Sequence, residues 1–555
     1  MRRVVPVLAL VLLASACGDD TGTRPSGDPF AVATTVPTTA SSATTSTSAT
    51  TDTFRPTVRE AFMAGCTEDG SEEVCACTLQ EIERRITLEQ FLALDDADPI
   101  DRAFIFDVTE ICLARLDGAS IAASATTTTT TTTTTSGDPG TTTTTAPPRP
   151  LTLDEVIQVT VADLESYWEV EQPAAYGTSY EPIERVVPYV PSSESIPDCG
   201  DESITADVAA DNAFYCNPDD YIAWDAEGLF PGLFVEFGDF TIALVLAHEW
   251  GHAVQNRVEE FGPTIQTELQ ADCFAGSWTG AISRGEREAL SLDPGDIEEA
   301  MSGYLLFRDP PGTGPNDPGA HGSAFDRVNA FRLGLLEGVD ACRQASNDFP
   351  VAFIPVDPRH PSGNLPYAQL PLLSDALEVF WAAIWPGLFE GEWVPVSATV
   401  PYYPSTGEFP ACGDLDLDPG FYADNAFYCP EGDFVAWDDE VLFPALYQSI
   451  GDMAIGHILA HEWATAVQAR AGLPSQGLEA ELQADCTSGA FAAALTVDGN
   501  PTGIQLSAGD LDEAVATFIQ FGEDPEEAGL TGGAFDRFDA FQEGFFGGIG
   551  ACFPG

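Results

Sequence analysis

Two histidines spaced four residues apart, His248 and His252, lie in the segment HEWGH. The surrounding residues 241–258 are largely apolar and contain no proline, so they predict a helix. Residues four apart share one face of a helix, and both imidazoles can therefore point at one metal ion. Glu249 then falls beside the ion, where its carboxylate can take a proton from a metal-activated water. The spacing indicates hydrolytic metal chemistry.

A catalytic zinc takes three protein ligands and keeps one open position, so two histidines are not sufficient. The segment ELQAD at 268–272 begins sixteen residues after His252. On a second helix, Glu268 can supply the third ligand, and Asp272 can hydrogen-bond the far nitrogen of a histidine ligand and fix its tautomer. Two simpler interpretations stay open, a buried helix with hydrogen-bonded histidines and a purely structural zinc. Glu249 argues against the structural zinc, because a closed site has no use for a base.

The longer segments around these residues are AHEWGHAVQ and ELQADCFAG, with FYC upstream and HGSAFDRVNAFRLG downstream. Together they resemble the neutral zinc metallopeptidase family of bacteria. The resemblance is good over residues 151–345, weaker beyond them, and does not reach residues 54–122. It implies a zincin-like fold, with His248 and His252 as zinc ligands, a glutamate as third ligand and Glu249 as base. Glu268 and Asp272 fill the places of the third ligand and its supporter.

A metallopeptidase also needs a donor for the oxyanion of the tetrahedral intermediate. His321, in the segment HGS, is our candidate, and the alternative is an ordinary loop histidine. Tyr304 is a weaker candidate for this donor. Its phenol could do the same job, but a tyrosine in such a sequence is more often part of the core. Residues 212–224 alternate like a strand, which is either part of the core or an edge to which an extended peptide adds.

The region that carries the motif is written twice. The words DNAFYC, AHEW and ELQADC recur 213 positions later, and AFDR recurs at 534–537. The copies run from 151 to 345 and from 366 to 555, with a proline-rich linker at 346–365. Each copy has four cysteines, for which three pairings are open. The pattern favours Cys199–Cys216, Cys273–Cys342, Cys412–Cys429 and Cys486–Cys552.

The second copy lacks a complete metal motif, because Thr465 stands where the first copy has His252. A threonine hydroxyl is a poor zinc ligand. Thr531 and Phe518 stand in the places of His321 and Tyr304. We therefore expect an inactive second domain and one Zn²⁺ per chain. One alternative is a shifted pair of His457 and His461, which would no longer have Glu462 in the usual place.

The first 150 residues predict export and a stalk. Residues 1–16 have a basic start, an apolar stretch and small residues, as in a signal peptide. Cys17 follows, and its lipidation would leave twelve cysteines that can all pair. The Thr-rich segments 17–53 and 123–150 cannot bury enough apolar surface to fold. Between them, residues 54–122 predict a small helical domain whose four cysteines form disulfides more readily than a metal site.

The charge balance excludes several classes of partner. Against 88 acidic residues the chain has 21 basic ones, all arginine, so the net charge is −67. Such a surface repels nucleic acid and anionic lipid. No apolar run reaches the roughly 18 to 20 residues that span a bilayer. Any membrane association is expected to use only the N-terminal lipid.

The expected fold class is α+β, with two tandem zincin-like domains after the small disulfide-linked helical domain and the Thr-rich linkers. The expected function is that of a zinc peptidase acting on peptides or proteins at the outer face of the cell membrane, or secreted if Cys17 is not lipidated. The alternative function is that of a non-catalytic envelope protein that binds peptides or proteins through the same domains. The sequence leaves open whether the two copies pack together.

Overall fold

The computed structural model describes Leu79 and residues 151–553, apart from positions 194–195, 202, 288, 294, 318, 357–362, 414–418, 498 and 523–532. The chain divides into two compact units, one of Met1–Asp19 with Arg149–Gly555 and the other of Asp20–Pro148. The predictions for the signal peptide, Cys17, both Thr-rich segments and the four-cysteine domain lie outside the described residues. Among the helices that are described, none has the length and apolar character to cross a membrane.

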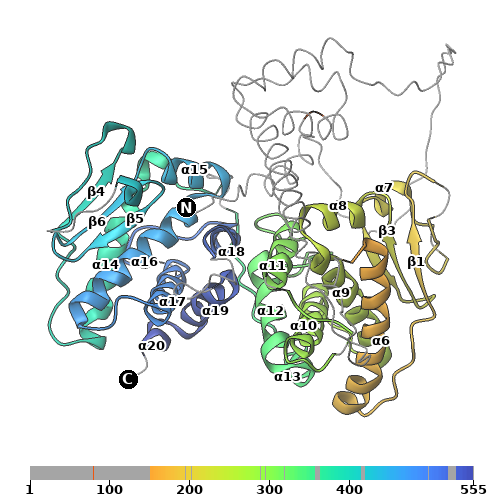
Figure 1. Ribbon diagram of the computed structural model, residues 1–555. Coiled ribbons are helices and arrows are strands. Elements are labelled where there is room, and N and C mark those ends of the chain that lie inside the picture. The colour runs from red at the N-terminus through yellow and green to blue at the C-terminus, as the bar shows by residue number, and fades with distance from the viewer. Residues whose placement is uncertain are drawn as a thin grey trace, which may run out of the picture. The chain divides into compact units, whose positions relative to one another are not determined.

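Residues 151–345 combine helices with one small sheet, and the same order of elements recurs in residues 366–553 (Figure 1). The first half contains α6 (Leu153–Tyr176), β1 (Arg185–Tyr189), α7 (Ala206–Ala209), β2 (Ala213–Cys216), β3 (Tyr221–Asp225), α8 (Leu229–Glu236), α9 (Asp239–Val258), α10 (Thr264–Ser283), α11 (Asp296–Leu306), α12 (Ala324–Glu337) and α13 (Val339–Gln344). The predicted mixture of helices and strands is therefore confirmed.

The second half begins with the short 3-10 helix η2 (Tyr367–Gln369), and two more 3-10 turns, η3 (Pro404–Thr406) and η4 (Pro419–Tyr422), lie between its first two strands. Its other elements are α14 (Pro371–Leu388), β4 (Ala398–Tyr402), β5 (Ala426–Cys429), β6 (Phe434–Asp438), α15 (Leu442–Ser449), α16 (Asp452–Ala471), α17 (Leu478–Leu495), α18 (Asp510–Phe521), α19 (Ala534–Gly547) and α20 (Ile549–Cys552).

Each half has a three-stranded sheet with the strand order β1-β3-β2 or β4-β6-β5. The central strand β3 is buried along its whole length, pairs in parallel with β1 and pairs antiparallel with β2. The segment 212–224, which the sequence predicts as one strand, is instead a hairpin of β2 and β3. Its turn includes Asp220, whose φ of 45° lies in the left-handed region that aspartate tolerates better than most residues. The hairpin leaves β2 at the edge of the sheet.

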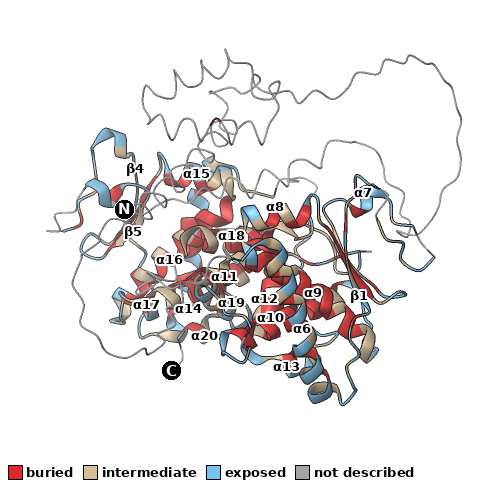
Figure 2. Cartoon of the chain, turned by 45° about the vertical axis from the view of Figure 1, so that its right-hand side comes forward, coloured by how far each residue is buried: buried red, intermediate tan, exposed pale blue. Residues whose placement is uncertain are grey.

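Helices α9 and α10 form the buried centre of the first half (Figure 2). α9 begins after Gly238, where a Cβ would lie 2.1 Å from the carboxylate of Glu299. This glycine lets Glu299 approach and accept a hydrogen bond from the Phe240 amide at 3.0 Å. The Glu299 side chain thus satisfies one of the free amides at the N-terminal end of α9. The predicted helix 241–258 is confirmed, with two further residues at its start.

Glycines also bring α10 close to α12. A Cβ on Gly276 would lie 1.9 Å from the Phe331 carbonyl oxygen, and one on Gly334 would lie 1.8 Å from the Cys273 carbonyl oxygen. The structure contains Cys273–Cys342, which ties α10 to α13, and Cys199–Cys216, which ties β2 to the preceding loop. Cys412–Cys429 and Cys486–Cys552 make the same connections in the second half. All four pairs are those that the sequence favours.

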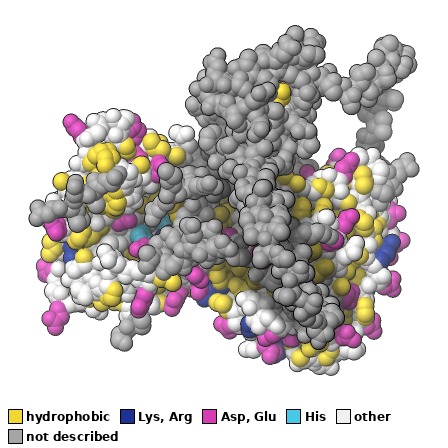
Figure 3. Space-filling view, in the orientation of Figure 1, with side chains coloured by type: hydrophobic (Ala, Val, Ile, Leu, Met, Phe, Trp, Pro, Cys, Tyr) yellow, Lys and Arg dark blue, Asp and Glu magenta, His cyan; other side chains and the backbone are white. Residues whose placement is uncertain are grey.

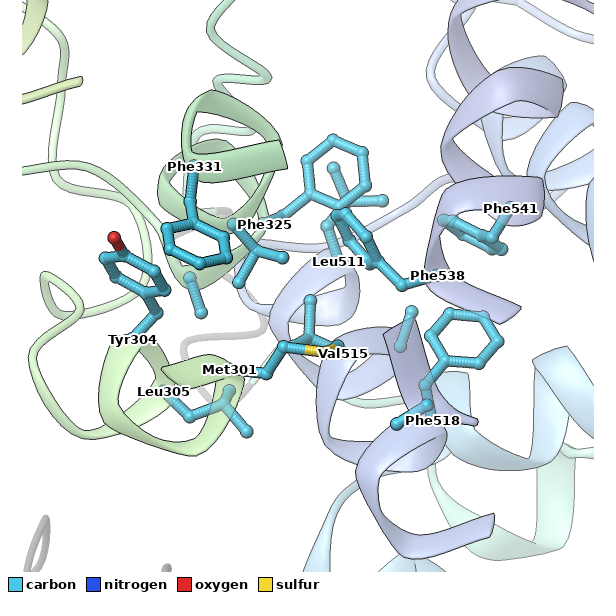
Figure 4. Packing of buried hydrophobic residues seen from close by; sticks show 14 of the residues in the cluster. Met301, Tyr304, Leu305, Phe325, Phe331, Leu511, Val515, Phe518, Phe538 and Phe541 are labelled. Carbon is cyan, nitrogen blue, oxygen red and sulfur yellow. The ribbon is translucent and has the colours of Figure 1, made fainter. Parts of the chain in front are cut away.

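The two halves contact each other through α11 and α12 of the first half and α18 and α19 of the second. The buried ring of Phe325 lies beside Leu511 and Phe538, and its centroid is 5.7 Å from that of Phe538 (Figure 4). Asp512, which is also buried, accepts a hydrogen bond from the Phe325 amide at 3.1 Å and pairs with Arg308 at 3.4 Å. The contact between the two halves therefore consists of apolar packing around Phe325 together with a hydrogen bond and an ion pair to Asp512.

Candidate metal centre

The structure brings His248, His252 and Glu268 together on the facing sides of α9 and α10. The Nε2 atoms of the two histidines are 3.1 Å apart. The Oε2 atom of Glu268 is 3.2 Å from Nε2 of His248 and 3.4 Å from Nε2 of His252. These three atoms form one small triangle, although Glu268 comes from a different helix. The sequence spacing predicts this convergence.

The triangle has the size that a zinc ion needs. With Zn–N and Zn–O bonds of about 2.0–2.2 Å in a tetrahedron, two ligand atoms are roughly 3.3 Å apart. The observed separations are 3.1, 3.2 and 3.4 Å. The Oε2 atom of Glu268 is buried and faces the two imidazole nitrogens. A buried carboxylate oxygen in that position fits a cation as its partner.

The electrostatics of the site also favour positive charge. Burial alone would raise the pKa of the Glu268 carboxyl, but the imidazoles of His252 and His248 hold it well below its usual range. Burial would lower the pKa of His248, whereas the carboxylates of Asp272 and Glu268 raise it to about 10. A metal ion competes with this proton for the same nitrogen, so metal affinity falls in acid.

Each histidine is oriented by a hydrogen bond from its second nitrogen. Nδ1 of His248 lies 2.7 Å from Oδ1 of Asp272, as the sequence predicts. Nδ1 of His252 lies 3.0 Å from Oε1 of Gln255, which was not predicted. Gln255 is held in turn by donating to the Thr267 carbonyl at 2.7 Å. These bonds leave the Nε2 atoms of both histidines facing Glu268.

Arg327 of α12 is a second residue that the sequence reasoning missed. Its guanidinium binds both oxygens of the wholly buried Asp272, with Nε at 2.8 Å from Oδ2 and another nitrogen at 2.9 Å from Oδ1. It also donates to the Phe307 carbonyl at 3.0 Å. Both copies retain the segment AFDR, which contains this arginine. A buried Asp272 needs a positively charged partner, and that requirement together with the repeated segment indicates Arg327.

Glu249 lies beside the two histidines and is only 7% exposed. Burial raises the pKa of its carboxyl, while the neighbouring His248 and His252 act in the opposite direction. The backbone of Tyr215, in the edge strand β2, also contacts this carboxylate. In the second half the corresponding bond runs from the Tyr428 amide to Glu462 at 2.7 Å. The base position is therefore next to the edge of the sheet.

A cleft of about 660 Å³ opens onto the three converging side chains. Phe214 and Tyr215 of strand β2 line this cleft, and so does His321. The His321 side chain is 51% exposed, and its Nδ1 is 3.5 Å from Oδ1 of Asp309. Tyr304 also lines the cleft but is 1% exposed, with its ring 5.1 Å from the Arg327 guanidinium. His321 is thus the more accessible of the two candidate donors.

The second half keeps the frame of the site without its second imidazole. His461 binds Asp485 at 2.8 Å through Nδ1 and Glu481 at 3.0 Å through Nε2. The Thr465 hydroxyl instead donates to the His461 carbonyl oxygen of its own helix at 3.3 Å. Arg537 binds Asp485 as Arg327 binds Asp272. Thr531, expected in the place of His321, lies outside the described residues.

The shifted histidine pair does not form an open metal site. Nε2 of His457 is 3.4 Å from Oδ1 of Asp485, and the ligand atoms of His457, His461 and Asp485 lie within 4.8 Å of one another. Arg537 already occupies both oxygens of Asp485, and Nδ1 of His457 is 2.8 Å from the hydroxyl of Ser488. Phe518 packs its ring 4.6 Å from the His457 ring. These contacts describe a closed hydrogen-bond network.

Comparison with known proteins points to the same chemistry. Residues 111–345 match the sequence model of a family described as “Putative neutral zinc metallopeptidase”. The chain is similar to “Uncharacterized protein Rv2575” of Mycobacterium tuberculosis, with 32% identity over 152 residues that make up 22% of this chain and 52% of that protein. It is also similar to “Uncharacterized protein YpfJ” of Escherichia coli K12, with 30% identity over 123 residues, 18% of this chain and 42% of that protein.

The chain spans about half the length of the curated relatives it matches. No solved structure matches the chain. The family match includes the whole first half and implies zinc as its metal.

Proposed function

We propose that this protein is a zinc-dependent peptidase whose first half, residues 151–345, hydrolyses peptide bonds. The observation that carries the proposal is the convergence of His248, His252 and Glu268, with Glu249 buried beside them. The family match over residues 111–345 supports zinc as the metal and peptide hydrolysis as the reaction. A purely structural zinc would not account for the open cleft beside Glu249.

Each residue has a distinct task in this reaction. Bound zinc would polarise the scissile carbonyl and lower the pKa of a water to about 7. Glu249 accepts the proton of the attacking water and passes it to the leaving amine, for which the raised pKa of its carboxyl is suitable. Asp272 and Gln255 keep the two histidines turned toward the metal. His321 donates a hydrogen bond to the oxyanion from the rim of the cleft.

The edge strand β2 is the proposed binding surface for the substrate backbone. An extended peptide that pairs with β2 lies along the wall of the cleft and passes Glu249. The second half serves as a non-catalytic domain, because Thr465 supplies no ligand. We further propose that the protein is exported and held at the outer face of the cell membrane by a lipid on Cys17.

The test is the Glu249→Gln variant of the full-length protein. We expect it to retain one zinc per chain and to lose about 10²- to 10⁴-fold in peptide cleavage, because only the base is removed. The matched control is Glu462→Gln, the same change at the equivalent position of the second half, which should leave cleavage unchanged. The measurements are zinc content by elemental analysis and cleavage of a broad peptide library.

A zinc-loaded wild type that cleaves no faster than Glu249→Gln would contradict the proposal and favour a peptide-binding envelope protein. Activity that is lost in Glu462→Gln and kept in Glu249→Gln would place the reaction in the second half.

A further inference from the structure

The arginines in the described part of the chain are almost all bound to acidic partners within it. The chain has no lysine, and nine of the ten arginines in the described residues form an ion pair with an aspartate or glutamate. The tenth, Arg185, lies over the ring of Tyr221, 4.5 Å from its centroid. Figure 3 shows many acidic side chains on the visible face and few basic ones. An anionic ligand therefore meets little free positive charge.

The cleft repeats this imbalance. The only arginine or lysine among its described lining residues is Arg327, which is buried and already bound to both oxygens of Asp272. Two acidic side chains, Asp211 and Glu260, lie on the lining outside the metal centre. Glu260 accepts hydrogen bonds from the hydroxyl of Tyr176 at 3.1 Å and from the side-chain amide of Gln270, and neither donor carries a charge that would cancel its own.

The remaining lining is rich in aromatic and aliphatic side chains. Phe261, next to Glu260, is 66% exposed, and Phe214 of β2 and Phe307 lie on the same cleft. Arginine and lysine side chains have long apolar stems and a charged end, so they can pack on such rings and reach the carboxylates. Away from the metal centre, an aspartate or glutamate side chain finds no free arginine or lysine among the described lining residues, and the same holds for the carboxylate at the end of a peptide.

We propose that the substrates are neutral to basic segments within longer chains, cleaved at internal bonds, and that acidic segments and C-terminal carboxylates are rejected. This inference rests on the proposed function and names its substrate class. Asp211 and Glu260 determine the preference locally, and the net charge of −67 adds a long-range attraction for basic chains.

The experiment compares three peptides that are blocked by acetyl and amide groups and differ only in whether lysine, glutamine or glutamate flanks one central apolar residue. Cleavage by the zinc-loaded full-length protein gives kcat/KM, and fluorescence anisotropy with the Glu249→Gln variant gives affinity without cleavage. We expect both to fall in the order lysine, glutamine, glutamate. The lysine-to-glutamate ratio should be about tenfold or more at low salt and shrink in 0.5 M NaCl because of screening.

Two variants separate the cleft from the general charge of the molecule. Asp211→Asn and Glu260→Gln should each lower the lysine-to-glutamate ratio severalfold, because each removes one local charge. Asparagine also tolerates the φ of 53° at position 211. The matched control, Asp424→Asn at the equivalent position of the second half, should leave the ratio unchanged.

Equal affinity for the three peptides, a preference for glutamate, or binding that requires a free C-terminal carboxylate would overturn the inference. Ordered affinities without any cleavage would support the charge preference and contradict the peptidase function instead. A ratio that responds equally to Asp211→Asn and Asp424→Asn would also overturn it, since the cleft would then have no local role.

Discussion

The two histidines of the metal centre are held by unlike partners. His248 is held by a charged chain that runs through Asp272 to Arg327, whereas His252 is held by the neutral amide of Gln255. Both partners fix the ring through Nδ1 and leave Nε2 for the metal. The carboxylate of Asp272 can take only one orientation, because Arg327 binds both of its oxygens. Arg327 is therefore a positioning residue that would act on the proposed zinc through Asp272 and His248.

Replacing Arg327 with glutamine should weaken zinc binding about 10- to 100-fold, the usual effect of losing an outer partner of a ligand. Competition with a chelator of known affinity measures this loss without depending on activity. The control is Arg537→Gln in the second half, which breaks an equivalent ion pair. Both variants remove the arginine partner of a buried aspartate and should lose about 3–5 kcal/mol of stability.

Only Arg327→Gln should change the zinc affinity. If both variants weaken zinc binding equally, the loss reflects general destabilisation and Arg327 has no specific role.

At the scale of single residues, the sequence predicts those features of the site that follow from the geometry of one helix. The spacing of His248 and His252 is enough to place both on one face, and ELQAD places Glu268 and Asp272 one turn apart. The contact of Arg327 with Asp272 depends on how α12 crosses α10, and the two residues are 55 positions apart. No local sequence pattern determines how α12 crosses α10. The repeated segment AFDR only indicates that Arg327 is retained in both copies.

Between elements, the distance from α9 to α10 is determined at Gly251, in the middle of the metal motif. A Cβ at this position would lie 2.8 Å from Cα of Ala271 and 3.1 Å from its carbonyl oxygen. Both are backbone atoms, so an alanine must push the helices apart. α10 carries Glu268, so a change in the distance between the helices shifts the proposed third ligand relative to both histidines. The second half has Ala464 at the equivalent position, and there Glu481 needs to reach only one imidazole, that of His461 at 3.0 Å.

The variant Gly251→Ala should accordingly bind zinc at least severalfold more weakly, because Glu268 moves away from His248 and His252. Alanine is the better helix former by roughly 1 kcal/mol, so the isolated helix gains from the change. A loss of metal affinity would thus come from packing, and isothermal titration with zinc would measure it. The reciprocal variant Ala464→Gly should leave the zinc affinity unchanged, and an unaltered affinity in Gly251→Ala would contradict the packing argument.

The elements themselves were predictable to different degrees. The helix at 241–258 follows from a long apolar stretch without proline, and the structure extends it by two residues. The alternating segment 212–224 is a hairpin. A turn around Asp220 breaks the strand in two, and the apolar-polar alternation of the sequence runs on across that turn. The sequence repeat with its offset of 213 residues correctly predicts which elements of the two halves correspond, because identical segments form the same helices and strands in both.

For the whole molecule, the contact between the halves joins their cores. Phe325 packs among Phe538, Phe541, Phe545 and Phe546 with ring centroids 5.1–6.3 Å apart. The sequence does not predict this packing, because the apolar faces of α12 and α19 could equally be buried within their own halves.

Several buried carboxyls make the stability of the molecule depend on pH. Burial raises the pKa of Glu299 to about 8, that of Asp510 to about 7, and those of Asp326 and Asp512 to about 6. The folded state therefore binds more protons than the unfolded state between about pH 4 and pH 8. The free energy of unfolding must then decrease as the pH rises through this window.

We expect the full-length protein to melt at a higher temperature at pH 5.5 than at pH 8. Measuring Tm in 0.5 M NaCl screens the repulsion between surface charges and leaves the buried groups. Glu299→Gln should reduce the difference, because the amide can still accept from Phe240 and no longer ionises. The exposed Glu337→Gln is the control and should change nothing. A Tm that rises steadily to pH 8 would contradict the buried-carboxyl explanation.

The disulfide Cys273–Cys342 has a consequence for the order of maturation. Cys273 directly follows Asp272 in α10, so the bond anchors the same helix that carries the third ligand. In a reducing compartment the newly made chain would have its paired histidines but an unanchored Glu268. With the proposed export, oxidation would come first and metal capture second, and the proposed peptidase would stay inactive toward its neighbours until it left the compartment where it was made.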